Sequence, residues 1–490
     1  MQFLILLAIF VSVLPDLPSG LVKDPVWSVT GTWGSVLSLG ILIWSAGVFF
    51  PQLWSRRGMA PSLWWYRLIR GLFYIGTVAV QLLSLAVFNW NNTLRQSWGL
   101  GDWIVIDELL AMSPLVFSLV VLWWGIYPAE KTLHYHLGHS GSAPFWTRSG
   151  YVFFQMRTHA ALLFAPLLLY VAMQELGLMI ELKASPGNDK SVEYSLAISI
   201  LAVITVLVFL PWILVRLWDT EPLPPGELRQ LLSETAKRLG FRYTDFRVWH
   251  TQQNIANALV TGILPWPRYI VFSDGLLNAL SPAELVAVLG HEIGHIRRGH
   301  LPLYIGLCIL AVTSGVQLLT WRWPGQEQYF LAVLFRLPSQ LPDWMQWVEF
   351  AGGAAVLWSY VWLVFGYVSR QCEREADVYG CLAASTITEA ISVPEDLEMK
   401  KRQTKALTPE GIRTFIRALE KVADVNGLSR RQWSWRHGSI TRRIAYLEKL
   451  EQRAERGHFW PRWLWLPSWT ILAILGLSVL GLHYIGTGIL

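Results

Sequence analysis

Apolar runs of about twenty residues recur along this 490-residue chain and constrain its fold more than any other feature. Hydrophobic residues make up 53% of the sequence and charged residues only 15%, a balance that excludes an ordinary soluble globular protein. Many of the 28 tryptophans stand at the ends of these runs, as expected for side chains at a membrane interface. The sequence therefore predicts a mainly α, polytopic transmembrane helix bundle, with the lipid bilayer as a partner.

About eight membrane spans are expected. They cover approximately residues 33–50, 71–89, 104–127, 159–180, 195–217, 302–321, 347–368 and 466–488. A further apolar run, residues 2–14, is cut short by Pro15 and Pro18. It is compatible with a ninth span, a weak signal peptide or an interfacial segment, and the sequence does not decide between them.

Arginine-rich loops predict the orientation of the chain. Residues 51–70 contain four arginines and no acidic residue, whereas residues 90–103 contain one arginine. Because loops rich in Lys and Arg stay on the cytoplasmic side, alternation of the spans places residues 218–300 there. The membrane would be the inner membrane of a bacterial cell or the endoplasmic reticulum of a eukaryotic one. Basic loops beside an anionic leaflet also account for the net charge of +6, so no nucleic acid partner is expected.

Residues 222–300 have the composition of a small α+β unit. A helix is expected at Gly226–Leu239 and strands at Phe246–His250 and Tyr269–Ser273, with the segment Asn257–Gly262 between the two strands. A further helix should begin after Ser281, because Ser281, Pro282 and Glu284 form a capping-box pattern. An edge strand in such a unit can hold an extended peptide by backbone pairing.

This last helix carries the sequence HExxH. His291 and His295 lie four residues apart and leave the same helix face, so both imidazoles can bind one metal ion, while Glu292 can act as a general base. A third, anionic ligand is needed from elsewhere, and Glu373 is the candidate. Asp377, one turn further, can fix the tautomer of a ligating imidazole. The competing interpretation is that HExxH is a chance pattern and that the two acids are solvated charges.

The segments HEIGHIRRGH and SRQCEREAD resemble the membrane-embedded zinc endopeptidase family that includes the CaaX prenyl proteases and the HtpX heat-shock protease. The family pattern, HExxH followed by S-R-x-x-E-x-x-A-D, is matched residue for residue. The resemblance implies one Zn²⁺ per chain, with Glu373 rather than Glu375 as its third ligand. It also implies a gluzincin-type catalytic domain that is split around a transmembrane hairpin.

Two flanking segments extend the resemblance. Asn257-Ala258, followed by Gly262, is similar to the N-A-x-x-x-G of the family's substrate-binding edge. Residues 437–444 are similar to its H-P-P-x-x-x-R-[IL] segment, although glycine and serine replace the two prolines. The resemblance implies that His437 stabilises the oxyanion and that Arg443 helps to order the site.

The expected function is that of an integral membrane zinc metalloendopeptidase that hydrolyses membrane-associated proteins or peptides, with Glu292 as general base. The alternative is a catalytically silent zinc-binding membrane sensor or scaffold of the same fold. The chain is expected to divide into five parts. These are an N-terminal membrane domain (1–220), the first half of the catalytic domain (221–300), a transmembrane hairpin (301–368), the second half of the catalytic domain (369–462) and a C-terminal transmembrane helix (463–490). The sequence does not identify the physiological substrate or the oligomeric state. It also does not distinguish prenyl-protein processing from membrane quality control.

Several other residues have two possible interpretations. The histidines at 134, 136 and 139 form a second metal site or, more in keeping with their loop, an interfacial or pH-sensitive surface. Asp107, Glu108, His159 and Glu175 line a water-filled interior or mark helix ends at the interface. Residues 386–413 are expected to be a polar surface insertion or a lid. No structural disulfide is expected among Cys308, Cys372 and Cys381.

Overall fold

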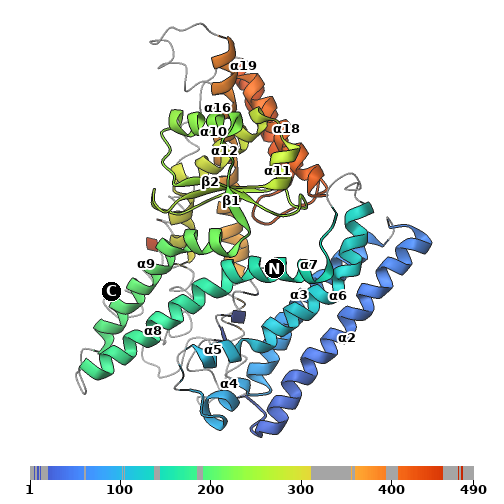
Figure 1. Cartoon of the computed structure of the whole chain (residues 1–490), viewed down its shortest axis with the longest axis vertical. Helices are drawn as coiled ribbons and strands as arrows, with labels where there is room; N and C mark the ends of the chain where they lie inside the picture. Colours follow the sequence, from blue (N-terminus) through green and yellow to red (C-terminus); the bar gives the residue numbers. More distant parts are fainter. Residues whose placement is uncertain are drawn as a thin grey trace. The chain divides into compact units, whose positions relative to one another are not determined.

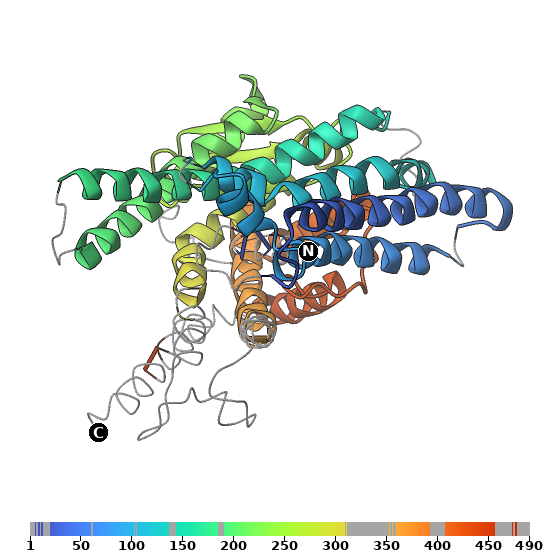
Figure 2. The same cartoon turned by 90° about the horizontal axis from the view of Figure 1, so that it is seen from below.

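The computed structural model describes residues 20–59, 62–101, 103, 105–136, 144–184, 191–308, 359–392 and 407–455, with a few isolated positions outside these ranges. The chain divides into two compact units, and the boundary falls between Trp218 and Asp219. Figure 1 and Figure 2 show the elements of both units in two views. The finer division of the chain into five segments stays a prediction.

The first unit consists of helices, and each begins and ends as follows. They are α2 (Pro25–Arg57), α3 (Leu63–Ala86), α4 (Trp90–Asn92), a π-helical segment (Thr93–Ser97), α5 (Ile106–Ala111), α6 (Ser113–His136), α7 (Arg148–His159), a second π-helical segment (Ala160–Phe164), α8 (Ala165–Ala184) and α9 (Ser191–Leu217). Helices α2, α3 and α6 lie side by side, and α8 packs along α9 (Figure 1).

Four helices in the described part of the chain are long and apolar enough to cross a membrane. They cover Pro25–Arg57, Leu63–Ala86, Arg148–Gly177 and Ala197–Leu217. Four of the spans expected from the sequence fall on these helices, which agrees with a multi-pass membrane protein. The expected spans at 302–321 and 466–488 and the run at 2–14 lie largely outside the described residues, and the expected span at 347–368 is described only in part, so the total of eight or nine stays a prediction.

The expected span at 104–127 differs from the structure, because the chain there forms two helices. Helix α5 ends at Ala111 and α6 begins at Ser113 and continues to His136. Pro114 explains the interruption, since proline has no N–H with which to bond the carbonyl of Leu110. That carbonyl instead accepts hydrogen bonds from Ser113 Oγ (2.6 Å) and Trp90 Nε1 (3.0 Å).

Three acidic groups of the first unit, Asp107, Glu108 and Glu175, have local partners. Arg95 pairs with Asp107 (2.7 Å) and with Glu108 (3.3 Å). Glu175 lies near these two carboxylates and accepts a hydrogen bond from the backbone N–H of Val105 (2.8 Å). Whether these groups line a water-filled interior stays a prediction.

The second unit combines a small sheet with helices. Its elements are β1 (Thr220–Pro222), α10 (Glu227–Arg238), β2 (Asp245–Trp249), β3 (Ala258–Thr261), β4 (Tyr269–Ser273), α11 (Asp274–Ala279), α12 (Pro282–Arg297), a π-helical segment (Val361–Phe365), α16 (Gly366–Ser392), α18 (Pro409–Val425) and α19 (Ile440–Glu455). The helix and strands expected between residues 222 and 300 are confirmed to within a residue or two.

The sheet has the strand order β1-β2-β4-β3 and packs against α12. Strands β2 and β4 are parallel, while β1 and β3 pair antiparallel with their neighbours. Alternation of side chains places Phe246 of β2 with Ile270 and Phe272 of β4 in one buried cluster. Leu285 and Leu289 of α12 complete this core. Because β3 is last in the strand order, it lies at an edge of the sheet among the described strands.

Helix α12 begins as the sequence predicts. The backbone N–H of Ser281 donates to the Glu284 carboxylate (2.8 Å), and Ser281 Oγ accepts from the Glu284 N–H (3.4 Å). Lys421 of α18 donates to the same carboxylate (2.8 Å), which ties α18 to the start of α12. The capping box is confirmed, and it fixes where the helix that carries HExxH starts.

The bounds expected for a polar insertion, residues 386–413, are wrong at both ends. Helix α16 continues to Ser392, and α18 already begins at Pro409. Ile412 and Phe415 of α18 are fully buried, because its apolar residues recur at helical spacing and face α16. Residues 393–406, between the two helices, lie outside the described residues.

Two glycines allow α12 to lie close to α16. A Cβ atom at Gly290 would lie 2.3 Å from Cβ of Ala383 and 2.9 Å from the carbonyl oxygen of Tyr379. A Cβ at Gly294 would lie 3.1 Å from Cα of Ala376. A larger residue at either position would push the helices apart, and with them the side chains that they present to each other.

The variant Gly290→Val is therefore expected to lower the free energy of unfolding by about 1–3 kcal/mol, the usual cost of overpacking. The neighbours that must move are backbone and Cβ atoms, which cannot swing aside. Thermal melting of the purified protein in detergent measures the change. Gly71→Val in α3, where a Cβ would meet nothing within 4 Å, is the control and should melt like wild type. Equal melting of both variants would show that α12 and α16 can separate at little cost.

Candidate metal centre

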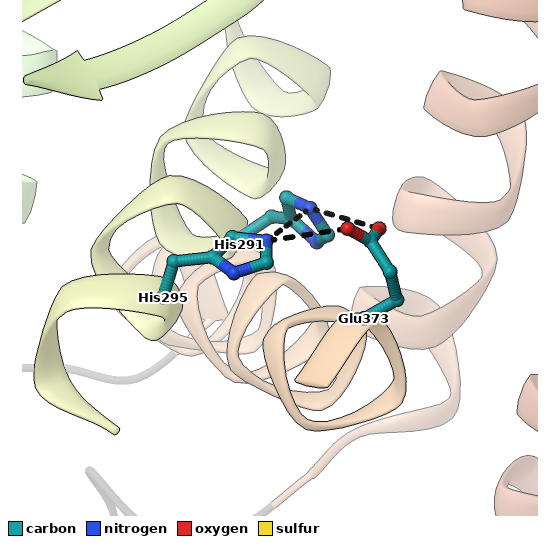
Figure 3. A group of neighbouring side chains, drawn as sticks. All are labelled: His291, His295 and Glu373. Carbon is teal, nitrogen blue, oxygen red and sulfur yellow. Dashed lines mark hydrogen bonds and ion pairs between the residues drawn. The ribbon is translucent and has the colours of Figure 1, made fainter. Parts of the chain in front are cut away.

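Three side chains from α12 and α16 point toward one another (Figure 3). His291 Nε2 lies 3.2 Å from His295 Nε2. Glu373, from α16, brings Oε2 to 3.8 Å from His291 Nε2 and Oε1 to 3.7 Å from His295 Nε2. The structure thus brings the expected third ligand to the two histidines, although it comes from a distant part of the sequence.

This donor set fits a zinc ion. Nitrogen and oxygen ligands lie about 2.0–2.2 Å from Zn²⁺, so three ligand atoms of a tetrahedral site are roughly 3.3–3.6 Å apart. The two histidine nitrogens lie 3.2 Å apart, close to this range, and each of them lies 3.7–3.8 Å from one oxygen of the Glu373 carboxylate, Oε1 for His295 and Oε2 for His291. Two imidazoles and one carboxylate also leave a fourth position open, as catalytic zinc sites require.

The electrostatics of His295 and Glu373 favour the protonation states that bind a metal. Burial and the neighbouring His291 hold the pKa of His295 well below its usual value, so His295 is neutral. Burial alone would raise the pKa of Glu373, but the hydrogen bond from His437 and the charge of Arg443 lower it well below its usual value. Glu373 is therefore an anion despite its 4% exposure.

Asp377 and Arg443 form a buried ion-pair network with His291 and Glu373. Asp377 Oδ1 lies 3.1 Å from His291 Nδ1, where it can orient the imidazole. Burial lowers the pKa of His291, but the hydrogen bond and charge of Asp377 outweigh this and raise it. Arg443 donates from Nε to Asp377 Oδ2 (2.9 Å), and its Nη1 lies 3.3 Å from Glu373 Oε2. Arg443 thereby links the two carboxylates of α16.

Glu292 stands beside the histidines on α12. Burial of its carboxyl group raises the pKa to about 7, with a further rise from Glu373. The charges of His291 and Arg443 and a hydrogen bond with the backbone of Val260 act in the opposite direction. A carboxyl group whose pKa lies near neutrality is suited to accept and return a proton.

His437 reaches the site from a short loop before α19. Its Nδ1 lies 2.8 Å from Glu373 Oε1, and its side chain is half exposed. The loop is closed by two backbone hydrogen bonds between Ser434 and Gly438, and Gly438 has φ +73°, which favours glycine. The replacement of proline by glycine is therefore accommodated. The expected role of His437 at an oxyanion stays a prediction.

Asn257 and Ala258 lie at the start of the edge strand β3. The Asn257 backbone N–H donates to Ser273 Oγ (2.9 Å), and its carbonyl accepts from the Ser273 N–H (2.9 Å). Ala258 pairs with Phe272 of β4. These bonds hold one side of the strand, and no other described strand pairs with its far side. Substrate binding at this edge stays a prediction.

Sequence reasoning missed one pair of residues at the site. His300 Nδ1 lies 2.9 Å from His295 Nδ1, and His300 Nε2 lies 3.3 Å from Glu375 Oε2. The available signal was the short spacing of His300 from the HExxH motif, with Gly299 between them at φ +68° to turn the chain back after α12. Glu375 was considered only as a rival ligand to Glu373.

Two further groups considered in the sequence are the histidines at 134, 136 and 139 and the three cysteines. Within the described residues, His134 and His136 belong to no group of side chains close enough to share an ion, and His139 lies outside them. His136 Nδ1 lies instead 2.8 Å from the carbonyl of Thr132. Cys308, Cys372 and Cys381 are free thiols in the structure.

A helix bearing HExxH, packed against a second helix that supplies a glutamate, is the ligand arrangement of the HExxH class of metallopeptidases. Residues 222–451 match the model of peptidase family M48. This segment makes up a little less than half of the chain, and the resemblance of the chain to the CaaX prenyl proteases and HtpX is confirmed.

Curated relatives support this assignment. A protease HtpX homolog of Aeropyrum pernix is 30% identical over 133 residues, which are 26% of this chain and 41% of the relative. CAAX prenyl protease 1 of Saccharomyces cerevisiae is 37% identical over 82 residues, 16% of this chain and 18% of the relative. A protease HtpX homolog of Moorella thermoacetica is 26% identical over 215 residues, 41% of this chain and 64% of the relative. The chain thus spans less than two thirds of the length of each of these relatives.

A solved structure also aligns with the chain. S. mikatae Ste24p covers 88% of this chain and 100% of its own, with 16% identity and a TM-score of 0.47. Similarity at that level supports no assignment of residues or activity.

Proposed function

We propose that this chain is an integral membrane zinc metalloendopeptidase that hydrolyses peptide bonds in membrane-associated proteins or peptides. The observation that carries the proposal is the convergence of His291, His295 and Glu373 on one point between α12 and α16. The match of residues 222–451 to the model of peptidase family M48 supports the reaction type, and the four apolar helices support the membrane setting.

His291, His295 and Glu373 would hold the ion. When bound, zinc supplies Lewis acidity that acidifies water and polarises a peptide carbonyl. Glu292 takes the proton from the attacking water and returns it to the leaving amine. Asp377 keeps His291 in the orientation that directs Nε2 to Glu373, and Arg443 balances the charge of the two buried carboxylates.

Substrate would bind as an added strand along β3. A backbone hydrogen bond from Val260, the third residue of this strand, lowers the pKa of Glu292. A peptide paired with the free side of β3 would therefore lie near the proposed base. His437, half exposed beside Glu373, would donate a hydrogen bond to the developing oxyanion. The arginine-rich loops favour an active site on the cytoplasmic side of the membrane.

Metal removal tests this proposal. Purified full-length protein is expected to contain about one zinc and to cleave members of a mixed library of membrane-associated peptides. Chelation should abolish cleavage, and added zinc should restore it, because His291, His295 and Glu373 supply no nucleophile of their own. Mass spectrometry of the products and metal analysis measure both effects. Zinc without any cleavage would favour the sensor or scaffold, and absence of zinc would overturn the assigned ligands.

A further inference from the structure

The pair formed by His300 and Glu375 lies behind the second histidine of the metal centre. His300 is 2% exposed and Glu375 is 8% exposed. His300 follows α12 in the chain, whereas Glu375 lies on α16, two residues beyond Glu373. Two buried polar side chains from separate elements thus meet at a position where water cannot replace either of them.

The hydrogen-bond roles in this pair follow from the chemistry of the groups. An ionised carboxylate only accepts, so His300 Nε2, at 3.3 Å from Glu375 Oε2, carries the proton. The other nitrogen of a neutral imidazole is then an acceptor. His300 Nδ1 lies 2.9 Å from His295 Nδ1, so the His295 nitrogen is the donor in that contact.

This order of donors and acceptors determines which nitrogen of His295 is free. With its proton on Nδ1, His295 presents the lone pair of Nε2, and this is the atom that lies 3.2 Å from His291 Nε2 and 3.7 Å from Glu373 Oε1. A histidine that binds a metal generally donates its other N–H to a neighbouring acceptor, which fixes both the tautomer and the ring.

The two histidines of HExxH are therefore held in different ways. His291 has a carboxylate, Asp377, directly at its Nδ1. His295 has the imidazole of His300 at its Nδ1, and the Glu375 carboxylate contacts His300 rather than His295 itself. We propose that His300 and Glu375 are positioning residues that hold His295 in its metal-binding tautomer. The inference rests on the proposed function, since it takes His295 as a zinc ligand.

Zinc affinity of the purified full chain, measured by competition with a chelating dye, tests the inference. His300→Leu removes the acceptor at His295 Nδ1 and is expected to weaken zinc binding about 10–100-fold, the usual effect of losing such a partner. His300→Asn places an amide oxygen close to the position of Nδ1 and should recover a large part of the affinity. Glu375→Gln keeps an acceptor for His300 and should stay closer to wild type than Glu375→Leu.

Melting of the metal-free protein separates positioning from a general structural role. Positioning predicts that His300→Leu and His300→Asn melt alike without metal and differ in zinc affinity. The matched control is His250→Leu, since His250 and Glu221 form a second histidine–glutamate pair in this unit, in which His250 is half exposed and Glu221 exposed. That variant should bind zinc like wild type.

Two results would overturn the inference while leaving the proposed function intact. One is a wild-type zinc affinity in His300→Leu, and the other is an equal loss of affinity in His300→Leu and His300→Asn together with an equal loss of metal-free stability. A wild-type protein that binds no zinc would overturn both proposals, so the two failures can be told apart.

Discussion

Replacing Glu292 by glutamine is expected to lower kcat by about 10²–10⁴-fold, the usual contribution of a general base, while zinc stays bound. The amide has nearly the shape of the carboxylate but cannot take up a proton from water. Glu292 is not part of the donor set of His291, His295 and Glu373, so the metal content should not change. Cleavage rates and metal analysis of the two purified proteins, side by side, measure the effect.

The matched control is Glu234→Gln, at an exposed glutamate on α10 of the same unit. It makes the same chemical change and should cleave like wild type. Full activity in Glu292→Gln would show that another group acts as the base. Loss of zinc from this variant would show instead that Glu292 is needed to hold the ion, and the proposed division of roles would have to be revised.

Local rules predicted the elements of the second unit well. The capping box at Ser281 and Glu284 involves residues three positions apart, so it can be recognised in the sequence and is present in the structure. The strand Tyr269–Ser273 is likewise determined by a short apolar run and has the expected bounds. The shared face of His291 and His295 is a third local consequence, since it follows from helix periodicity alone.

Tertiary packing was much harder to predict. Glu373 reaches the histidines because Gly290 and Gly294 let α12 approach α16 closely, and a glycine within a helix does not show what packs against it. Only the resemblance of the motif to a known family selected Glu373 over Glu375. The contact of His300 with Glu375 depends on the same approach of the two elements, so the sequence does not show that these two residues, 75 positions apart, meet.

Averaged composition misled the sequence analysis in two places. Hydropathy over residues 104–127 does not reveal that Pro114 interrupts the backbone hydrogen bonds between α5 and α6. The polar composition of residues 386–413 concealed two helix ends, although Ile412 and Phe415 already follow the spacing of an amphipathic helix. In both cases the position of single residues determines the structure, and an average over many residues cannot report it.

Arg443→Met is expected to lower the free energy of unfolding of the metal-free protein by about 3–5 kcal/mol, the cost of breaking a buried ion pair from one side. Arg443 pairs with Asp377 and Glu373, whose exposures are 0% and 4%. Methionine fills much of the same space, but it leaves two buried carboxylates one helical turn apart without the guanidinium, so that Asp377 keeps only His291 and Glu373 only the histidines around it. Zinc bound at Glu373 would restore positive charge, so added zinc should raise the melting temperature more in the variant than in wild type.

Arg442→Met is the matched control, because it makes the same change at the neighbouring, exposed position of α19. It should melt like wild type with and without zinc. Equal melting of the Arg443 and Arg442 variants would show that Asp377 and Glu373 do not depend on the guanidinium for their charge balance. If Arg443→Met is destabilised and zinc does not recover it, the stabilising charge does not act through Glu373, and Asp377 alone is the partner that matters to folding.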